Sequence, residues 1–306
     1  MATALISHPA CRLHEMGSDH PESPRRLDVI GDQLQSLRIL DFLFHRDAPA
    51  VSREQLLRVH TPQYLDWLQE MLPKSGYSDI DLDTRMNKKT LLAASFAAGA
   101  GVFATDLVLG QEVENAFCNV RPPGHHASDS QAMGFCFYNN VAVAAAHALE
   151  AHELERVAIL DFDVHHGNGT EDIVSGDDRI LFCSSFQHPF YPGSGADTNV
   201  PNIINIPLPS LTDGAAFKEA MLERCIPRIE EFAPQLILIS AGFDGHRADD
   251  MAHFNLLEFD FAWITRQLCQ LATLSAENRV VSCLEGGYDL HALARSVEAH
   301  LRAFLD

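Results

Sequence analysis

Three residues in the second half of the chain have the types and spacing of ligands for a metal ion. Asp163 and His165 follow a short apolar run at residues 157–160, and Asp244 follows another at residues 236–240. Residues i and i+2 at the end of a strand project to the same side, so one carboxylate and one imidazole can reach the same ion. Two carboxylates and one histidine leave a position open for water or substrate, as a catalytic zinc requires. Iron(II) or cobalt would also suit this ligand set.

A second group of residues could move protons and stabilise charge. His125 and His126 follow a rigid Pro-Pro-Gly turn, from which adjacent side chains can diverge. They can act as base and charged partner only if their protonation states differ, and Asp161 and Asn168 would supply unequal partners. Tyr288 follows two glycines and could turn its hydroxyl toward a carbonyl oxygen that gains negative charge.

Each of these residues also has an ordinary structural explanation. Taken singly, the two aspartates could cap helices and His165 could be a core histidine. The histidine pair could lie on the surface, and Tyr288 could be a simple turn residue. All of them follow apolar runs, and this shared position favours one common site over a separate structural role for each residue.

Short apolar runs alternate along the whole chain with longer stretches of helical period. The runs VAILDF and LILIS are apolar on both faces, which is typical of a parallel sheet covered by helices on both sides. The predicted strands are residues 3–6, 116–120, 157–162, 180–183, 203–206, 236–239 and 280–284. The predicted helices are residues 23–37, 62–72, 88–109, 139–151, 215–231, 256–274 and 290–305. We therefore predict an α/β fold with one central parallel sheet. Because no repeat or linker divides the chain, we expect one domain over residues 1–306.

The order of elements also predicts where a ligand would bind. In open parallel sheets, ligands lie outside the carboxyl ends of the strands. Acidic, imidazole or phenol groups follow four of the predicted strands, in the segments RPPGHH, DFDVHHGNG, AGFDGHR and EGGYD. Four strands that deliver such groups to one edge indicate a functional site there.

Composition excludes some classes of partner. The chain has 306 residues, with 22 basic and 42 acidic side chains and a net charge of −20. A surface with this much negative charge repels phosphate backbones. We therefore expect no nucleic-acid partner and a preference for cationic ligands. An acidic cluster at Asp79, Asp81 and Asp83 is either a solvated loop or the rim of a site for a cationic substrate.

The cysteine content and the hydropathy of the chain indicate where in the cell we expect the protein. The seven cysteines are odd in number and include no CxxC pair, which is typical of a reduced, intracellular chain. Residues 91–110 are apolar and long enough to span a bilayer. They are rich in Ala and Gly and contain Asp106, so we expect a buried core helix and no membrane partner. The expected location is the cytoplasm of a prokaryotic cell, and the sequence does not define the oligomeric state.

The motifs resemble those of the zinc-dependent histone deacetylase and acetylpolyamine amidohydrolase superfamily. Most of the chain takes part, and the motifs occur in family order. They are HPESPRR at 20–26, VHTPQYL at 59–65, RPPGHH at 121–126, GFCFYNN at 134–140, LDFDVHHGNGT at 160–170, FYPGSG at 190–195, SAGFDGHRAD at 240–249 and LEGGYD at 284–289. The resemblance implies the arginase–deacetylase fold.

The resemblance also implies a role for each motif residue. Asp163, His165 and Asp244 would be the zinc ligands. The remaining catalytic group would be His126 as general base and acid, His125 as an electrostatic partner held by Asp161, Asn168 behind His126, and Tyr288 as oxyanion donor. The substrate-binding residues would be Gly134, Phe135, Phe190, Tyr191, Asp83 and Gly286, several of them lining a narrow tunnel. A structural potassium ion would be held by Asp161, Ser184 and backbone oxygens of Asp163 and His165.

Two residues depart from the most common pattern of the superfamily. Asn168 stands where class I members carry an aspartate, so the chain resembles a class II bacterial member with a less basic His126. Tyr191 stands where the family usually has a second phenylalanine, which alters the second wall of the tunnel.

These observations favour a zinc-dependent amidohydrolase that removes acetyl or other acyl groups from Nε-acyl-lysine. Two alternatives stay open. One is a deacetylase of acetylated polyamines or other small amides, which the acidic surface suits equally well. The other, from a different class, is a non-catalytic module that binds acylated lysine; such a module would not need the full set of ligands, histidines and tyrosine.

Overall fold

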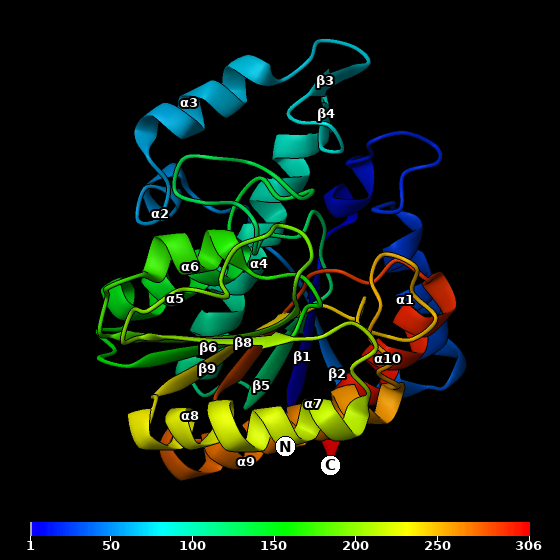
Figure 1. Cartoon of the computed structure of the whole chain (residues 1–306). Coiled ribbons are helices and arrows are strands. Elements are labelled where there is room, and N and C mark those ends of the chain that lie inside the picture. The colour runs from blue at the N-terminus through cyan, green and yellow to red at the C-terminus, as the bar shows by residue number, and fades with distance from the viewer. Residues whose placement is uncertain (1) are drawn as a thin grey trace.

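One large sheet of eight parallel strands runs through the computed structural model, which describes residues 2–306 (Figure 1). The strand order is β2-β1-β5-β10-β9-β6-β7-β8. In chain order these strands are β1 (Thr3–Ser7), β2 (Leu43–Asp47), β5 (Asn115–Cys118), β6 (Val157–Asp161), β7 (Ile180–Gln187), β8 (Ile203–Leu208), β9 (Leu236–Ala241) and β10 (Val280–Leu284). The predicted α/β fold with a central parallel sheet is thus confirmed.

Helices cover both faces of this sheet (Figure 1). One face carries α4 (Thr90–Leu109), α5 (Asn140–Ala151) and α6 (Asn168–Val174). The other face carries α1 (Arg25–Ser36), α7 (Gly214–Ala220), α8 (Ile226–Phe232), α9 (Glu258–Ser275) and α10 (Leu290–Leu305). The short α2 (Arg53–Leu56) contacts α5. Helix α3 (Pro62–Met71) and the antiparallel pair β3 (Tyr77–Asp79) and β4 (Arg85–Asn87) lie at the top of the view, near the N-terminal end of α4. Single 3₁₀ turns occur at Pro9–Leu13 and Ile39–Phe42.

The central strands are buried along their whole length. Every residue of β6 (VAILD), β9 (LILISA) and β10 (VVSCL) is buried. Side chains on both faces pack against helices, which explains why these runs are apolar without alternation. The residues that follow these strands are therefore attached to fully buried strands in the middle of the sheet.

One predicted helix needs correction, and one strand of the large sheet was not predicted. The helix expected over residues 215–231 is divided into α7 and α8 by a five-residue π-helical turn, Met221–Cys225. Pro227 lies at the start of α8, and because proline has no N–H it cannot continue the regular hydrogen-bond ladder. Strand β2 was not predicted because it forms an edge of the sheet, where four of its five residues are exposed and polar residues are tolerated.

Helix α4 corresponds to the long apolar segment. It has the length and hydropathy of a membrane span, yet 72% of its most apolar window is buried inside the protein. It contacts α5 and strands β1, β5 and β10, and its small Ala and Gly side chains permit this close packing.

Candidate active site

Four neighbouring strands, β5, β10, β9 and β6, deliver the motif residues to one edge of the sheet. His125 and His126 follow β5, and Tyr288 follows β10. Asp244 follows β9 and Asp163 follows β6. Residues from four distant parts of the sequence meet there because parallel strands end on the same side.

The predicted metal ligands converge on one point. Asp163, His165 and Asp244 each offer a ligand atom, and these atoms lie within 4.8 Å of one another. His165 Nδ1 is 3.2 Å from Asp163 Oδ1 and 3.1 Å from Asp244 Oδ2. Ligands bound at about 2.0–2.2 Å to one tetrahedral ion stand a little over 3 Å apart, so the spacing fits a shared ion.

Backbone groups pack closely around the two carboxylates. The amide of Gly286 donates to Asp163 Oδ2 at 2.8 Å, and the amide of Val164 donates to Asp244 Oδ1 at 3.1 Å. A Cβ atom on Gly286 would lie 2.1 Å from Asp244 Oδ2. The structure therefore places Gly286 against the carboxylates of the predicted metal ligands. We predicted that Gly286 contacts substrate, but it is not among the residues that line the cavity.

His165 bridges two acidic groups. Burial alone would lower the pKa of His165, but hydrogen bonds to Asp163 and Asp244 and their negative charges raise it to about 10. The two carboxylates in turn need positive charge close by, since a buried carboxylate without compensation is strongly unfavourable. A divalent cation would supply that charge and displace the proton of His165.

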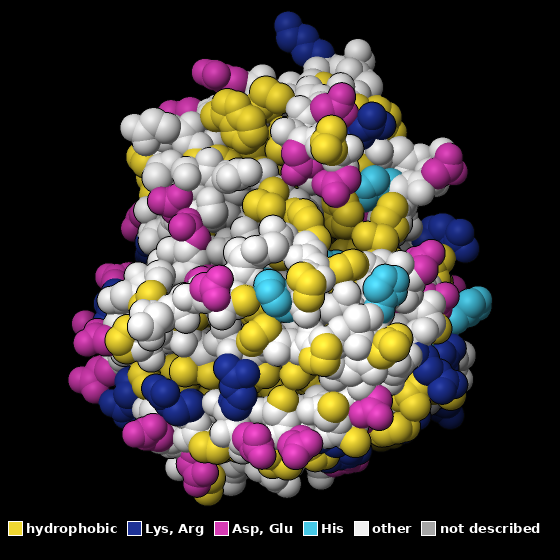
Figure 2. Space-filling model, in the orientation of Figure 1, with side chains coloured by type: hydrophobic (Ala, Val, Ile, Leu, Met, Phe, Trp, Pro, Cys, Tyr) yellow, Lys and Arg dark blue, Asp and Glu magenta, His cyan; other side chains and the backbone are white. Residues whose placement is uncertain are grey.

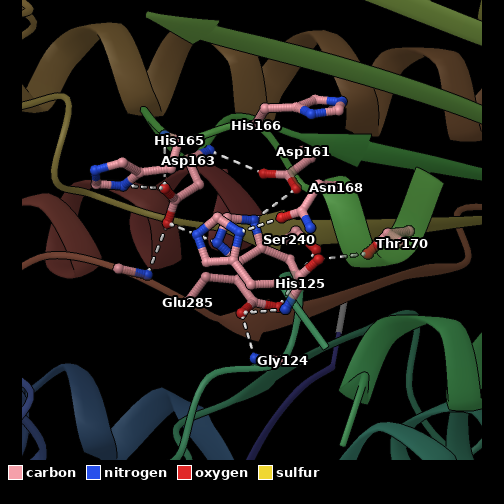
Figure 3. A network of polar contacts seen from close by, with 12 residues as sticks. Gly124, His125, Asp161, Asp163, His165, His166, Asn168, Thr170, Ser240 and Glu285 are labelled. Atoms are coloured by element: carbon pink, nitrogen blue, oxygen red, sulfur yellow. Dashed lines mark hydrogen bonds and ion pairs between the residues drawn. The ribbon is translucent and has the colours of Figure 1, made fainter. Parts of the chain in front are cut away.

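His125 is enclosed by carboxylates (Figure 3). Its Nδ1 donates to Asp161 Oδ2 at 2.9 Å, and its Nε2 lies 3.8 Å from Asp163 Oδ2. Burial lowers the pKa of His125, but the charges of Asp161 and Asp163 outweigh it and hold the pKa well above 6.5. The two carboxylates therefore favour the charged form of His125.

His126 has the opposite environment. Its Nδ1 donates to the amide oxygen of Asn168 at 2.7 Å, so Nε2 is left with a free lone pair. Burial and the neighbouring charges of His125 and His165 hold the pKa of His126 well below 6.5. These surroundings favour the neutral form of His126, whereas those of His125 favour its charged form.

Glu285 is a buried acid to which we assigned no role from the sequence. Its Oε2 accepts from the amides of Gly124 and His125, at 2.6 Å and 3.1 Å (Figure 3). Burial raises the pKa of Glu285 to about 7. The contact joins the turn after β10 to the turn before the histidine pair and so fixes the backbone of His125.

A cavity of about 220 Å³ opens beside His165, one of the predicted metal ligands. Its lining brings together Asp83, His126, Gly134, Phe135, His165, Phe190, Tyr191, Met251 and Tyr288. Five of the six predicted substrate-binding residues are in this set, and Met251 is a wall residue that the sequence analysis missed. In Figure 2, hydrophobic side chains gather on this face below the acidic side chains of the β3–β4 region.

The wall formed by Gly134 and Phe135 has an unusual backbone. Both residues have positive φ, 54° and 69°. A Cβ atom on Gly134 would lie 2.4 Å from His126 Cδ2, so only glycine allows the wall to approach the histidine. A phenylalanine with positive φ is uncommon, and such strain is concentrated at functional sites.

Ser184 lies behind the site on β7, in register with Asp161 on β6. Its hydroxyl oxygen is fully buried and has no hydrogen-bond partner within residues 2–306. Asp161 Oδ1 accepts the amide of Asp163 at 3.1 Å. A buried hydroxyl without a partner beside a carboxylate fits the chemistry of a cation site.

A second group, Asp106, His147 and His152, also has metal-binding residue types. Both histidine Nε2 atoms lie 2.7 Å from the same oxygen of Asp106. That spacing is a hydrogen-bond distance and is too short for two ligands of one zinc ion. The guanidinium of Arg58 donates to His147 Nδ1 at 3.0 Å. The ring proton of His147 is therefore on Nε2, which donates it to Asp106. This group is a hydrogen-bonded cluster between α4 and α5.

The parallel sheet and the residues at its edge together point to the deacetylase class of enzymes. The histone deacetylase domain matches residues 20–304, and the chain belongs to that family. It is 37% identical over 290 residues to the histone deacetylase-like amidohydrolase of Pseudomonas aeruginosa, over 92% of this chain and 74% of that one. It is 35% identical over 321 residues to the human polyamine deacetylase HDAC10, over 97% of this chain and 47% of that one.

A solved structure is also similar to this one. The crystal structure of the HDA15 HD domain superposes with a TM-score of 0.92 at 31% sequence identity, covering 99% of this chain and 89% of that chain. The arginase–deacetylase fold implied by the motifs is thereby confirmed.

The hydrogen bond between His126 and Asn168 can be tested through the pH dependence of the reaction rate. Asn168→Asp would place a carboxylate behind His126 and raise its pKa. The neutral base form of His126 would then require a higher pH, so the acid limb of kcat/KM for deacetylation should move to higher pH. The measurement is a pH–rate profile of both proteins. Asp172→Asn, which alters an exposed carboxylate of the same helix, serves as control and should not move the limb. An unchanged limb in Asn168→Asp would contradict the role of His126 as base.

Proposed function

We propose that this protein is a zinc-dependent amidohydrolase that removes acetyl or other acyl groups from the Nε atom of lysine in proteins or peptides. One observation carries the proposal. The buried group of Asp163, His165 and Asp244 adjoins an aromatic-walled cavity that also contains a neutral histidine, His126, and a tyrosine, Tyr288.

The residues present fit a zinc ion. Asp163, His165 and Asp244 would hold it, since all three are buried and their ligand atoms converge. When bound, zinc supplies a Lewis acid for the acyl carbonyl and lowers the pKa of a water toward about 7. Three protein ligands leave room for both.

In the proposed reaction, the histidine pair transfers the proton of the attacking water and stabilises the charge that develops. His126 accepts it at Nε2 from the attacking water, because its Nδ1 already donates to Asn168. His126 then passes the proton to the amine nitrogen as the C–N bond breaks. His125 stays charged through its contact with Asp161 and stabilises the negative charge that develops nearby.

Tyr288 lines the same cavity as His126 and His165. Burial raises the pKa of Tyr288 well above 10, so its hydroxyl stays protonated at neutral pH. It is therefore able to donate a hydrogen bond to the carbonyl oxygen of the substrate as that oxygen gains charge.

The walls of the cavity support a linear aliphatic substrate. Phe135, Phe190 and Met251 present apolar surface. Burial of the four methylenes of a lysine stem contributes about 3 kcal/mol, at about 0.8 kcal/mol for each. The hydroxyl of Tyr191 lies close to Gly134: a Cβ atom added to this glycine would be 3.0 Å from the hydroxyl oxygen.

An acetylated polyamine is the second candidate substrate. The human relative named as a polyamine deacetylase and the carboxylate of Asp83 at the cavity favour it. Asp83 is exposed, however, and an exposed ion pair contributes only about 0–1 kcal/mol. A peptide would add contacts of its backbone and neighbouring side chains at the mouth, so we favour acyl-lysine.

We also propose a structural potassium ion beside Asp161. The buried, unpartnered hydroxyl of Ser184 supports it, and the resemblance implies that backbone oxygens of Asp163 and His165 would complete the ligands. Such an ion would offset part of the negative charge behind His125.

Substitution of the tyrosine tests the proposed reaction. Tyr288→Phe removes the hydroxyl donor and should lower kcat by about 10²–10³-fold, while bound zinc stays unchanged because Tyr288 is not among the proposed ligands. Steady-state kinetics and metal analysis of the purified protein give both values. Tyr77→Phe, at an exposed tyrosine on β3, is the matched control. Full kcat in Tyr288→Phe would contradict the oxyanion role.

A direct comparison of substrates tests the preference for acyl-lysine. We expect a higher kcat/KM for an acetyl-lysine peptide than for acetylputrescine, by about tenfold or more, since the single exposed carboxylate of Asp83 gives the free ammonium of acetylputrescine little binding energy. The reverse ranking would favour the polyamine alternative. Binding of the peptide without any turnover would favour the non-catalytic module.

A further inference from the structure

Tyr288 lies in a five-residue turn, Glu285 to Asp289, whose backbone groups are held from two sides. On one side, Arg26 donates to the carbonyl oxygens of Glu285 and Gly287. The guanidinium of Arg26 also lies 5.0 Å from the centre of the Tyr288 ring. Gly287 has a φ of 121°, a conformation that requires glycine. These contacts fix the carbonyl side of the turn.

On the other side, a single carboxylate holds the amides. Asp249 Oδ2 accepts from the backbone N–H of Tyr288 at 2.5 Å and from that of Asp289 at 2.9 Å. Asp249 is 95% buried, with a relative exposure of 5%. Burial and the charge of Asp244 raise the pKa of Asp249 to about 6, and the hydrogen bonds from these amides favour its charged form.

The second oxygen of the same carboxylate reaches the wall of the cavity. Asp249 Oδ1 accepts from the backbone N–H of Met251 at 3.1 Å. The loop that carries both residues is itself fixed, because the Asp249 amide donates to the carbonyl of His246 at 2.8 Å. One side chain thus joins the tyrosine turn to the cavity wall.

We propose that Asp249 is a positioning residue that sets Tyr288 and Met251 in a fixed relation to each other, so that the hydroxyl donor and the substrate-binding wall are aligned together. The role of Tyr288 rests on the function proposed above. Asp249 itself does not line the cavity and touches no reacting atom.

The chemistry requires a carboxylate at this position. Three N–H groups converge on Asp249, and only a carboxylate offers two acceptor oxygens to meet them. Asn at this position would keep one oxygen and turn an NH₂ group toward an N–H donor. Either Met251 or the Tyr288 turn would lose its partner, and a displacement of about 1 Å at a catalytic group can cost about 10²-fold in rate.

A double-mutant cycle tests the proposal. Asp249→Asn should lower kcat of the zinc-loaded full chain by about 10–100-fold. In the Tyr288→Phe background the same substitution should cause no further loss of kcat, while any change in KM that arises from the Met251 wall should persist. Asp250→Asn, at the exposed neighbouring residue, is the matched control and should leave kcat and KM unchanged.

Hydrogen exchange gives a readout that does not depend on turnover. Faster exchange of the backbone amides of Tyr288, Asp289 and Met251 in Asp249→Asn, with no change in Asp250→Asn, would support the proposal. Equal exchange in both variants, or losses of kcat that add in the double variant, would overturn it. Asp249→Glu retains both oxygens and should show an intermediate loss, which provides a second variant if Asp249→Asn does not fold.

The two proposals fail differently. If the wild-type protein hydrolyses no acyl amide, the proposed function is wrong, and the exchange experiment still tests the contact network around Tyr288. If the wild-type protein is active and Asp249→Asn behaves like Asp250→Asn, only the positioning role of Asp249 is wrong.

Discussion

The burial of four carboxylates at one edge of the sheet is the constraint on which the site depends. Asp161, Asp163, Asp244 and Glu285 are all fully or almost fully buried, at relative exposures of 0–1%. Buried charges of one sign are strongly unfavourable unless they are paired or hydrogen-bonded. The compensation comes from the imidazolium of His125, from backbone amides and, in our account, from a divalent cation.

The same constraint explains how two adjacent histidines come to differ. His125 lies among the carboxylates and is held charged, whereas His126 faces the neutral amide of Asn168. The charge on His125 then lowers the pKa of its neighbour further. A charged partner and a neutral base therefore arise from where each side chain points, and the rigid strand ends keep both in place.

The sequence was sufficient to predict the parallel sheet and to bring Asp163, His165 and Asp244 to one site, because buried strands and the polar residues at their ends leave strong local patterns. Glu285, Met251 and Asp249 were not assigned roles, since their contacts join loops far apart in the chain. Glu285 and Asp249 lie within motifs that we recognised, yet a motif does not reveal which backbone amide a carboxylate will meet. Gly286 illustrates the converse: its position in a motif suggested substrate contact, but its lack of a side chain serves the close approach of two carboxylates.

The most direct test of this account is to measure metal content and acetate release on the same preparation. We predict about one zinc per chain, acetate release from an acetyl-lysine peptide, loss of both on treatment with a chelator, and recovery of both when zinc is restored. In Asp244→Ala, which removes one proposed ligand, both should be lost together. Acetate release that persists in the metal-free protein would contradict the central claim that the Asp163, His165 and Asp244 group holds the ion on which hydrolysis depends.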